Sequence, residues 1–320
     1  MWISTKIKIF ITDIVCRIFS WFPLRALTGN RYFRWWERKG VHITPVHFYM
    51  PIPEIRELEK RDIWRKKSDL VGIDMNVPEQ KELLHSLCFE FSDELVSLYK
   101  KKEEAKEENE YYIDNDFFGE VDAEMLYGII RKFKPAKIIE IGAGFSTRLA
   151  AQAILKNKAK DNSICKLVSI EPHPDPILKQ GFPGLSHLIT KKVEEVPIDE
   201  FLSLSANDIL FIDSSHVLKT GGDVEYIYLE ILPRLNKGVI IHVHDIFFPL
   251  EYPREWVVEN NFFWTEQYLL QAFLMFNSTF KVLWCGSYMH AEYPGELQKA
   301  FRSYNPETSS PKSFWMKKVL

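Results

Sequence analysis

Residues 137–149 read KIIEIGAGFSTRL, and this stretch decides the fold. Its apolar start, Ile138 to Ile141, predicts a buried parallel strand, and the apolar residues after position 148 recur at helical spacing. Gly142 and Gly144 allow the backbone to turn sharply between these elements and to approach a ligand closely. Ser146 or Thr147 can cap the helix that follows. The stretch therefore predicts a strand, a glycine turn and a helix around a nucleotide-type cofactor.

Two acids accompany this turn. Glu140 precedes Gly142 by two residues, and Glu171 ends the next apolar run, residues 166–171. A carboxylate at the end of that second strand can accept hydrogen bonds from both hydroxyls of a ribose. A nicotinamide-binding turn would more usually carry a third glycine at position 147, where this chain has threonine. A nicotinamide oxidoreductase is therefore the weakest of the functions that the turn allows.

Glu140, Gly142 and Gly144 resemble the E-x-G-x-G first motif of class I S-adenosylmethionine (SAM)-dependent methyltransferases. Over most of its length the chain resembles a bacterial group of these enzymes, related to the methyltransferase family 24 type, that act on small molecules or glycans. The resemblance implies SAM as the cofactor, with the glycine turn around its methionine half. The cofactor-binding residues that it implies are Glu140, Gly142, Gly144, Ser146, Thr147, Glu171 and Asp213.

Further apolar runs alternate with helical patterns along the chain. We expect strands at residues 187–193, 208–213, 238–245, 280–285 and 313–318. Apolar residues from Val224 to Leu235 recur at helical spacing between the fourth and fifth strands. The fold class is therefore α/β. It is a Rossmann-like class I methyltransferase sheet, mostly parallel, of seven strands with the last one antiparallel, and ligands bind at the carboxyl ends of its strands.

The composition sets outer bounds. The 320 residues are 46% hydrophobic, which is enough for one full core and an appendage. The net charge of −3 argues against a nucleic-acid partner, because such proteins cluster an excess of Lys and Arg. The four cysteines form no C-x-x-C pair, which fits a reducing, cytoplasmic location. We expect an N-terminal helical and irregular arm over residues 1–110 and a SAM-dependent methyltransferase domain over residues 111–320.

The arm has three predicted parts. Residues 7–22 are apolar at helical spacing, but Asp13 and Arg17 interrupt them, so they predict an amphipathic helix and neither a spanning helix nor a signal peptide. This helix either packs on protein, including a second copy in a homo-oligomer, or contacts the inner face of a membrane peripherally. Residues 40–76 are rich in turn formers and aromatics and predict a lid over the cofactor. A helix over residues 83–105 then runs into a charged stretch.

Polar residues end the fourth strand at IDSSH (212–216) and the fifth at HVHD (242–245), so we expect Asp213, His216, His244 and Asp245 to form the catalytic site. Three interpretations compete. Asp213, His244 and Asp245 would hold a divalent metal, as the resemblance to catechol O-methyltransferase implies, although histidine replaces an acid at position 244 and favours a softer ion. Alternatively, His216 or His244 is a metal-free general base. Lastly, His242 and His244 are structural.

These features predict a SAM-dependent methyltransferase that methylates a hydroxyl of a small molecule or glycan. Aromatic residues after the fifth strand would wall the substrate pocket: Phe247, Phe248, Tyr252, Trp256 and Phe263. The alternative is a non-catalytic SAM-fold protein that uses the N-terminal arm to dock on a partner. The two hypotheses differ in whether the four polar candidates converge beside the cofactor.

Overall fold

The computed structural model describes residues 5–21 and 28–320, and the chain forms two compact units, residues 1–63 and 64–320. The first unit contains helices α1 (Thr5–Ser20), α3 (Asn30–Glu37) and α4 (Ile55–Glu59). Helices α1 and α3 meet through Phe19 and Trp36, whose ring centroids are 6.1 Å apart. Phe22, the last residue of the predicted amphipathic helix, lies outside the described residues. Among the described helices, none is long and apolar enough to cross a membrane.

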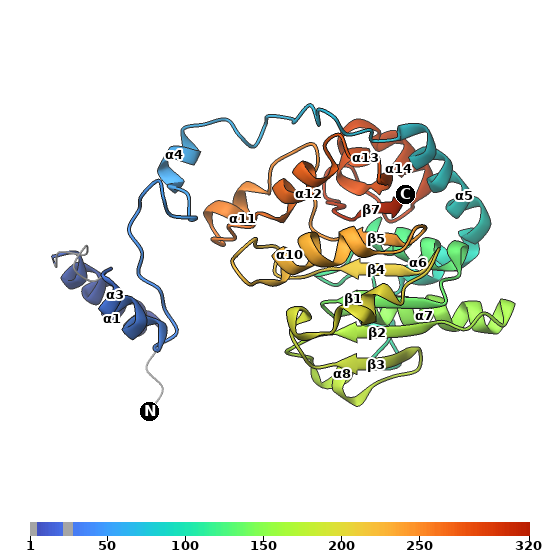
Figure 1. Ribbon diagram of the computed structural model, residues 1–320, viewed down its shortest axis with the longest axis horizontal. Coiled ribbons are helices and arrows are strands. Elements are labelled where there is room, and N and C mark those ends of the chain that lie inside the picture. Colours follow the sequence, from blue (N-terminus) through green and yellow to red (C-terminus); the bar gives the residue numbers. More distant parts are fainter. Residues whose placement is uncertain (1–4, 22–27) are drawn as a thin grey trace. The chain divides into compact units, whose positions relative to one another are not determined.

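The second unit is built on a sheet of seven strands in the order β3-β2-β1-β4-β5-β7-β6 (Figure 1). Strands β1 to β5 are mutually parallel, and β7 runs antiparallel to both β5 and β6. The seven predicted strands and the antiparallel last strand are confirmed. The strands are β1 (Lys137–Ile141), β2 (Lys166–Ile170), β3 (Leu185–Ile189), β4 (Ile209–Ile212), β5 (Ile240–Val243), β6 (Phe280–Cys285) and β7 (Phe314–Lys318).

Alternate residues of each strand enter two separate cores, one on each face of the sheet. Ile138 of β1 packs with the helices of one face, whereas its neighbour Ile139 packs with those of the other. The first core includes residues of α5 (Val77–Val96), α6 (Asp122–Phe133), α7 (Phe145–Asp161) and α14 (Pro294–Ala300). The second includes residues of α9 (Ile198–Leu202), α10 (Asp223–Tyr226) with its π-helical and 3₁₀ continuation (residues 227–234), and α12 (Glu266–Leu274). Short helices α8 (Pro176–Gln180), α11 (Arg254–Val258) and α13 (Gly286–Glu292) complete the unit.

Two predicted boundaries were wrong. The third strand ends at Ile189 and not at Val193, because its partner β2 ends at Ile170, the residue that pairs with Ile189. The helix predicted over residues 83–105 is α5, which starts earlier, with proline in its first turn, and ends at Val96. The charged stretch that follows is a loop with 3₁₀ turns, closed by an ion pair of 2.7 Å between Lys100 and Glu110. Local pairing of opposite charges therefore replaces a continuous helix.

The segment that precedes α5 is fixed against one edge of the sheet. The Asn76 side chain donates a hydrogen bond of 2.9 Å to the carbonyl of Val282 in β6, and Phe276 donates its backbone N–H to Gly72. Residues 72–76 of the predicted lid therefore lie beside β6, at the opposite edge of the sheet from β2 and β3. For the remainder of residues 40–76 the lid stays a prediction.

Candidate functional site

The turn between β1 and α7 requires glycine at one position for steric reasons. Gly142 has φ +81°, and a Cβ atom added there would lie 1.8 Å from the carbonyl oxygen of Asp213. Gly144, the residue before α7, has nothing within 4 Å of the position of an added Cβ. Its backbone N–H donates to the hydroxyl of Thr147 at 2.9 Å, so this threonine holds the start of the helix. The turn thus leaves open space beside Gly144, where a ligand can approach the backbone.

Glu140 lies beneath the turn. Its two carboxylate oxygens accept hydrogen bonds from the hydroxyls of Ser146 and Ser169, each at 2.7 Å, and its side chain is buried. Burial raises the pKa of Glu140 to about 7, against the opposing effect of these hydroxyl donors. Glu140 and Ser146 therefore tie the turn to β2. Their predicted contact with the cofactor stays a prediction.

A cavity of about 420 Å³ opens at the carboxyl ends of β1, β2 and β4, the volume expected for a small-molecule site. Gly142, Glu171 and Asp213 all line it, so the structure brings together three of the predicted cofactor residues. The Glu171 carboxylate accepts the backbone N–H of His173 at 2.7 Å and that of Ala143 at 3.4 Å. These bonds orient the carboxylate along the cavity, as a ribose-binding acid requires.

Several residues of this cavity were not predicted from the sequence. They come from the loops after β3 and β4, and they are Lys192, Val193, Glu194, Ser214, Lys219 and Asp223. The residues after β3 were missed because the predicted third strand extended through Val193, which hid the true strand end. A shorter strand, matched in length to β2, would have placed Lys192 and Glu194 at the ligand edge of the sheet.

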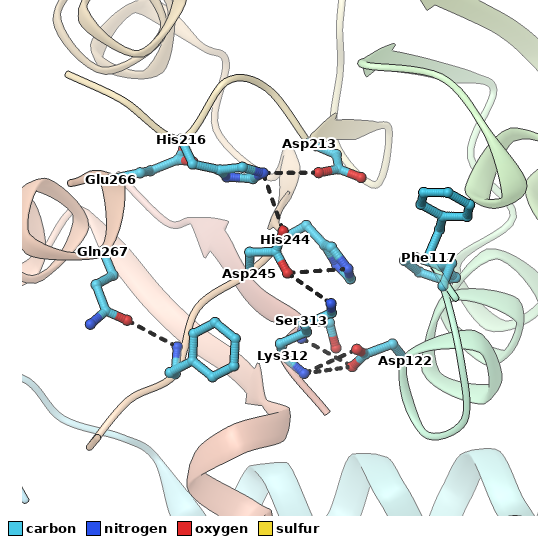
Figure 2. Close-up of polar contacts among 12 residues, drawn as sticks. Phe117, Asp122, Asp213, His216, His244, Asp245, Glu266, Gln267, Lys312 and Ser313 are labelled. Atoms are coloured by element: carbon cyan, nitrogen blue, oxygen red, sulfur yellow. Dashed lines mark hydrogen bonds and ion pairs between the residues drawn. The ribbon is translucent and has the colours of Figure 1, made fainter. Parts of the chain in front are cut away.

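The catalytic candidates converge on His216. Its Nε2 atom lies 3.2 Å from Asp213 Oδ1 and 3.3 Å from Asp245 Oδ2, and its Nδ1 lies 2.8 Å from Glu266 Oε2 (Figure 2). His216 and Asp245 both have positive φ, +59° and +57°, which is uncommon for residues other than glycine. Backbone strain of this kind concentrates at functional sites.

His216 is held as an imidazolium. Burial alone would lower its pKa, but hydrogen bonds to Asp213 and Glu266 and the charge of Asp245 raise the pKa well above its usual value. Burial raises the pKa of Asp213, yet nearby His244 and the hydrogen bond from His216 bring it below its usual range. Because its pKa is raised, His216 is a poor proton acceptor near neutral pH. The geometry therefore disfavours it as the general base.

Lys312 joins the site from the loop before β7. Its Nζ atom lies 3.1 Å from Asp245 Oδ1 and 4.8 Å from the ring centroid of Trp256. Its backbone N–H donates to the buried carboxylate of Asp122 at 3.0 Å, which fixes this loop beside the site (Figure 2). No spacing rule links Lys312 to Asp245 in the sequence. Only the antiparallel insertion of β7 beside β5 brings them together.

The two histidines of β5 differ in their surroundings. His242 stacks on Phe211 at 3.8 Å between centroids, and burial lowers its pKa well below the usual value, so it is a neutral part of the core. His244 Nε2 lies 3.9 Å from Asp245 Oδ1. Within the described part of the chain, neither ring nitrogen of His244 has a hydrogen-bond partner. Among the described residues the ring nitrogens of His242 also lack a partner, so His244 differs from His242 by lying beside Asp245.

A metal would find a different set of ligands from the predicted one. Ligand atoms of Asp213, His216 and Asp245 lie within 4.8 Å of one another, with His216 in the place that we expected for His244. The hydrogen bond from His216 to Glu266 is an arrangement that orients metal-binding histidines in other proteins. The Lys312 ammonium, however, already neutralises Asp245. The donor set fits a transition metal in residue type, but a fixed cation competes for one of its acids.

Two tryptophans border the acids. Trp264 lies 4.4 Å from the His216 ring and 5.1 Å from Trp256, measured between centroids. Phe248, by contrast, is buried against Phe314, and Tyr252 is buried with its hydroxyl accepting the Gln267 N–H. The place of Trp256 at a substrate pocket stays a prediction. Phe248 and Tyr252 serve the core instead.

Comparisons with known proteins agree with this architecture. A family model described as a methyltransferase domain, of the family 24 type, matches residues 139–246, which run from β1 past Asp245. An uncharacterised protein of Archaeoglobus fulgidus is 34% identical over 178 residues, which are 53% of this chain and 77% of the relative.

Two solved structures are also similar. One is the plantazolicin methyltransferase BamL in complex with a triazolic desmethylPZN analog and SAH. It is 16% identical in sequence, the match covers 61% of this chain and 82% of that chain, and the TM-score is 0.37. The other is a putative protein-L-isoaspartate O-methyltransferase of Plasmodium falciparum in complex with S-adenosyl-L-homocysteine. It is 14% identical in sequence, the match covers 52% of this chain and 83% of that chain, and the TM-score is 0.30.

Proposed function

The chain belongs to the class I SAM-dependent methyltransferases, and we propose that it methylates a hydroxyl oxygen of a small molecule or glycan. One observation carries the proposal. Asp213 lines the 420 Å³ cavity together with Glu171, and it also lies 3.2 Å from His216, which contacts Asp245. A single carboxylate thus joins the cofactor side of the site to its acceptor side.

The cavity suits SAM because it combines a strand-end acid with a turn where a ligand can approach the backbone. Glu171 accepts hydrogen bonds from the ribose, while the open space beside Gly144 admits the methionine half. When bound, SAM supplies an electrophilic methyl group on sulfur. Transfer of that methyl group to the acceptor oxygen would leave the electron pair of the C–S bond on the sulfur. The protein chiefly orients the acceptor oxygen and removes its proton.

His244 is the proposed general base. Its ring accepts the hydroxyl proton, and the charge of Asp245, whose Oδ1 lies 3.9 Å from Nε2, stabilises the resulting imidazolium. The cationic His216 acts by position, since it keeps Asp213 and Asp245 ionised and in place. Trp256 and Trp264 provide flat apolar surfaces for the acceptor.

The alternative, a non-catalytic SAM-fold protein, predicts that the polar candidates point away from any cavity or into the core. Asp213 lines the cavity, whereas His216, His244 and Asp245 are buried and do not line it. The catalytic proposal is supported by the contacts of His216 and Asp245 with this carboxylate and with each other. The four cysteines are free thiols, which fits the proposed cytoplasmic location.

Isothermal titration with SAM and S-adenosylhomocysteine tests the cofactor assignment. Glu171→Ala and Gly144→Val should each abolish measurable binding in a folded protein, because Glu171 is not a buried core residue and an added Cβ at Gly144 would meet nothing within 4 Å. Glu195→Ala is the matched control: this exposed acid lies next to Glu194 but outside the cavity lining, and its loss should leave the affinity unchanged. Failure of the wild type to bind either compound would refute the assignment.

Acceptor chemistry is tested by transfer of label from methyl-labelled SAM to paired hydroxyl and amine compounds of the same skeleton. Labelled ether should form only from the hydroxyl member. His244→Gln should reduce turnover at least 100-fold with SAM affinity intact, whereas His242→Phe should retain activity, because that ring packs in the core between Phe211 and Trp315. Equal losses in both variants would contradict the assignment of His244.

A further inference from the structure

Helix α1 carries an apolar stripe that is open to solvent. Ile7, Phe10, Ile11, Ile14 and Ile18 recur at the spacing of one helix face, and each of them is between 42% and 65% exposed. Trp21, directly after the helix, is 91% exposed. Isolated exposed apolar residues are common on proteins, but a continuous stripe of this kind marks an interaction surface.

Basic residues flank this stripe. At helical spacing, Arg17 lies along one border of the stripe, and the sequence of the helix contains two further cations, Lys6 and Lys8. Helix α3 adds Arg31 and Arg34, both exposed and three residues apart on one face. An apolar stripe with cationic residues beside it is the pattern of a helix that lies in the interface of a lipid bilayer.

The charge of this region is opposite to that of the chain. Residues 1–39 contain eight Lys and Arg but only two Asp and Glu, a net charge of +6, whereas the whole chain has −3. The excess is confined to the segment that carries the stripe, within the compact unit of residues 1–63. A symmetric contact between two α1 helices would bring these like charges together. An anionic surface would neutralise them instead.

We infer that residues 5–21 and 28–39 dock the protein on the surface of a membrane that contains anionic lipids. The apolar stripe of α1 enters the headgroup boundary, and the arginines of α3 contact the acidic headgroups. With 16 residues, α1 is about 24 Å long, shorter than a spanning helix, and it lies parallel to the surface. This interaction goes beyond methyl transfer and does not depend on it.

Co-sedimentation of the full chain with vesicles tests the inference. Vesicles with one anionic lipid in three should bind the wild type, and zwitterionic vesicles should bind it far less. Arg31→Ala with Arg34→Ala should weaken partitioning about 25-fold, because each charge near the surface contributes about fivefold. Phe10→Ser with Ile18→Ser should weaken it at least 10-fold. Raised salt should weaken binding to anionic vesicles, because the lipid charge is screened.

Matched variants of the other unit control for general effects of charge and apolarity. Lys158→Ala with Lys179→Ala removes two exposed cations, and Phe89→Ser with Ile164→Ser removes two exposed apolar side chains. Both should partition like the wild type. The inference is overturned if anionic vesicles do not bind the chain, or if the test and control variants partition equally. It is also overturned if light scattering without vesicles finds a dimer that Phe10→Ser with Ile18→Ser dissociates, since the stripe would then pair two copies. SAM titration, measured separately, decides the proposed function.

Discussion

Replacing His216 by glutamine should destabilise the sheet unit by about 3–5 kcal/mol, the range found when one partner of a buried ion pair is removed. Glu266 is fully buried, and His216 Nδ1 lies 2.8 Å from its Oε2. Without the imidazolium, Glu266, Asp213 and Asp245 repel one another in a site of low polarity. For a unit of this size, the expected fall in Tm is about 6–20 °C.

The assay is thermal and urea unfolding of the full chain, followed by far-UV circular dichroism, with a double-mutant cycle against Glu266→Gln. The double variant should be more stable than the sum of the single losses predicts, by about 1–3 kcal/mol, because two amides leave no unpaired charge. The pKa of His216 is raised in the folded protein. The stabilisation of the fold by His216 is therefore complete below about pH 6.5 and declines as the pH rises toward the folded pKa. A cost below about 1 kcal/mol, or strict additivity, would refute the ion-pair argument.

Three further predictions follow from the same geometry. Gly142→Ala should prevent folding, because its Cβ would overlap the Asp213 carbonyl, whereas Gly144→Val should fold; circular dichroism separates the two. The wild type should lose stability as the pH rises from 4.5 to 8, because Glu140 has a folded pKa of about 7. Glu140→Gln lacks this titration, so its stability relative to the wild type should be about 2–3 kcal/mol higher at pH 8 than at pH 4.5. Urea titrations at both pH values test this. Methyl transfer should persist in a strong chelator, because the His216 and Lys312 cations already pair with Asp213 and Asp245; loss of activity that Mn²⁺ restores, and that Asp245→Asn abolishes, would instead establish the metal site.

The sequence predicted those parts of the site that follow directly from strand ends. Asp213 and Asp245 each end an apolar run, and parallel strands bring such ends to one edge of a sheet. Contacts that depend on distant segments could not be predicted in this way. Glu266 belongs to a helix after an irregular loop, and Lys312 to the loop before an antiparallel strand, so neither has a fixed spacing from Asp245.

The roles of the histidines were harder to assign than their positions. His216, His242 and His244 all have the residue type of a general base, and the sequence left each interpretation open. Their environments distinguish them: three carboxylates surround His216, Phe211 covers His242, and His244 lies 3.9 Å from Asp245. Burial and charge set these differences, and both arise only when the strands pack.

The place of β7 between β5 and β6 has a consequence for how this protein is made. During synthesis the ribosome releases β6 before β7, yet β6 has no partner in the sheet until residues 314–318 emerge. Until then β5 presents an unpaired edge, which is a template for wrong pairing with other chains. The ion pair between Lys312 and Asp245 also forms late, because Lys312 lies just before β7 in the chain. The strands whose ends line the 420 Å³ cavity, β1, β2 and β4, are thus synthesised well before the segment that brings Lys312 to Asp245.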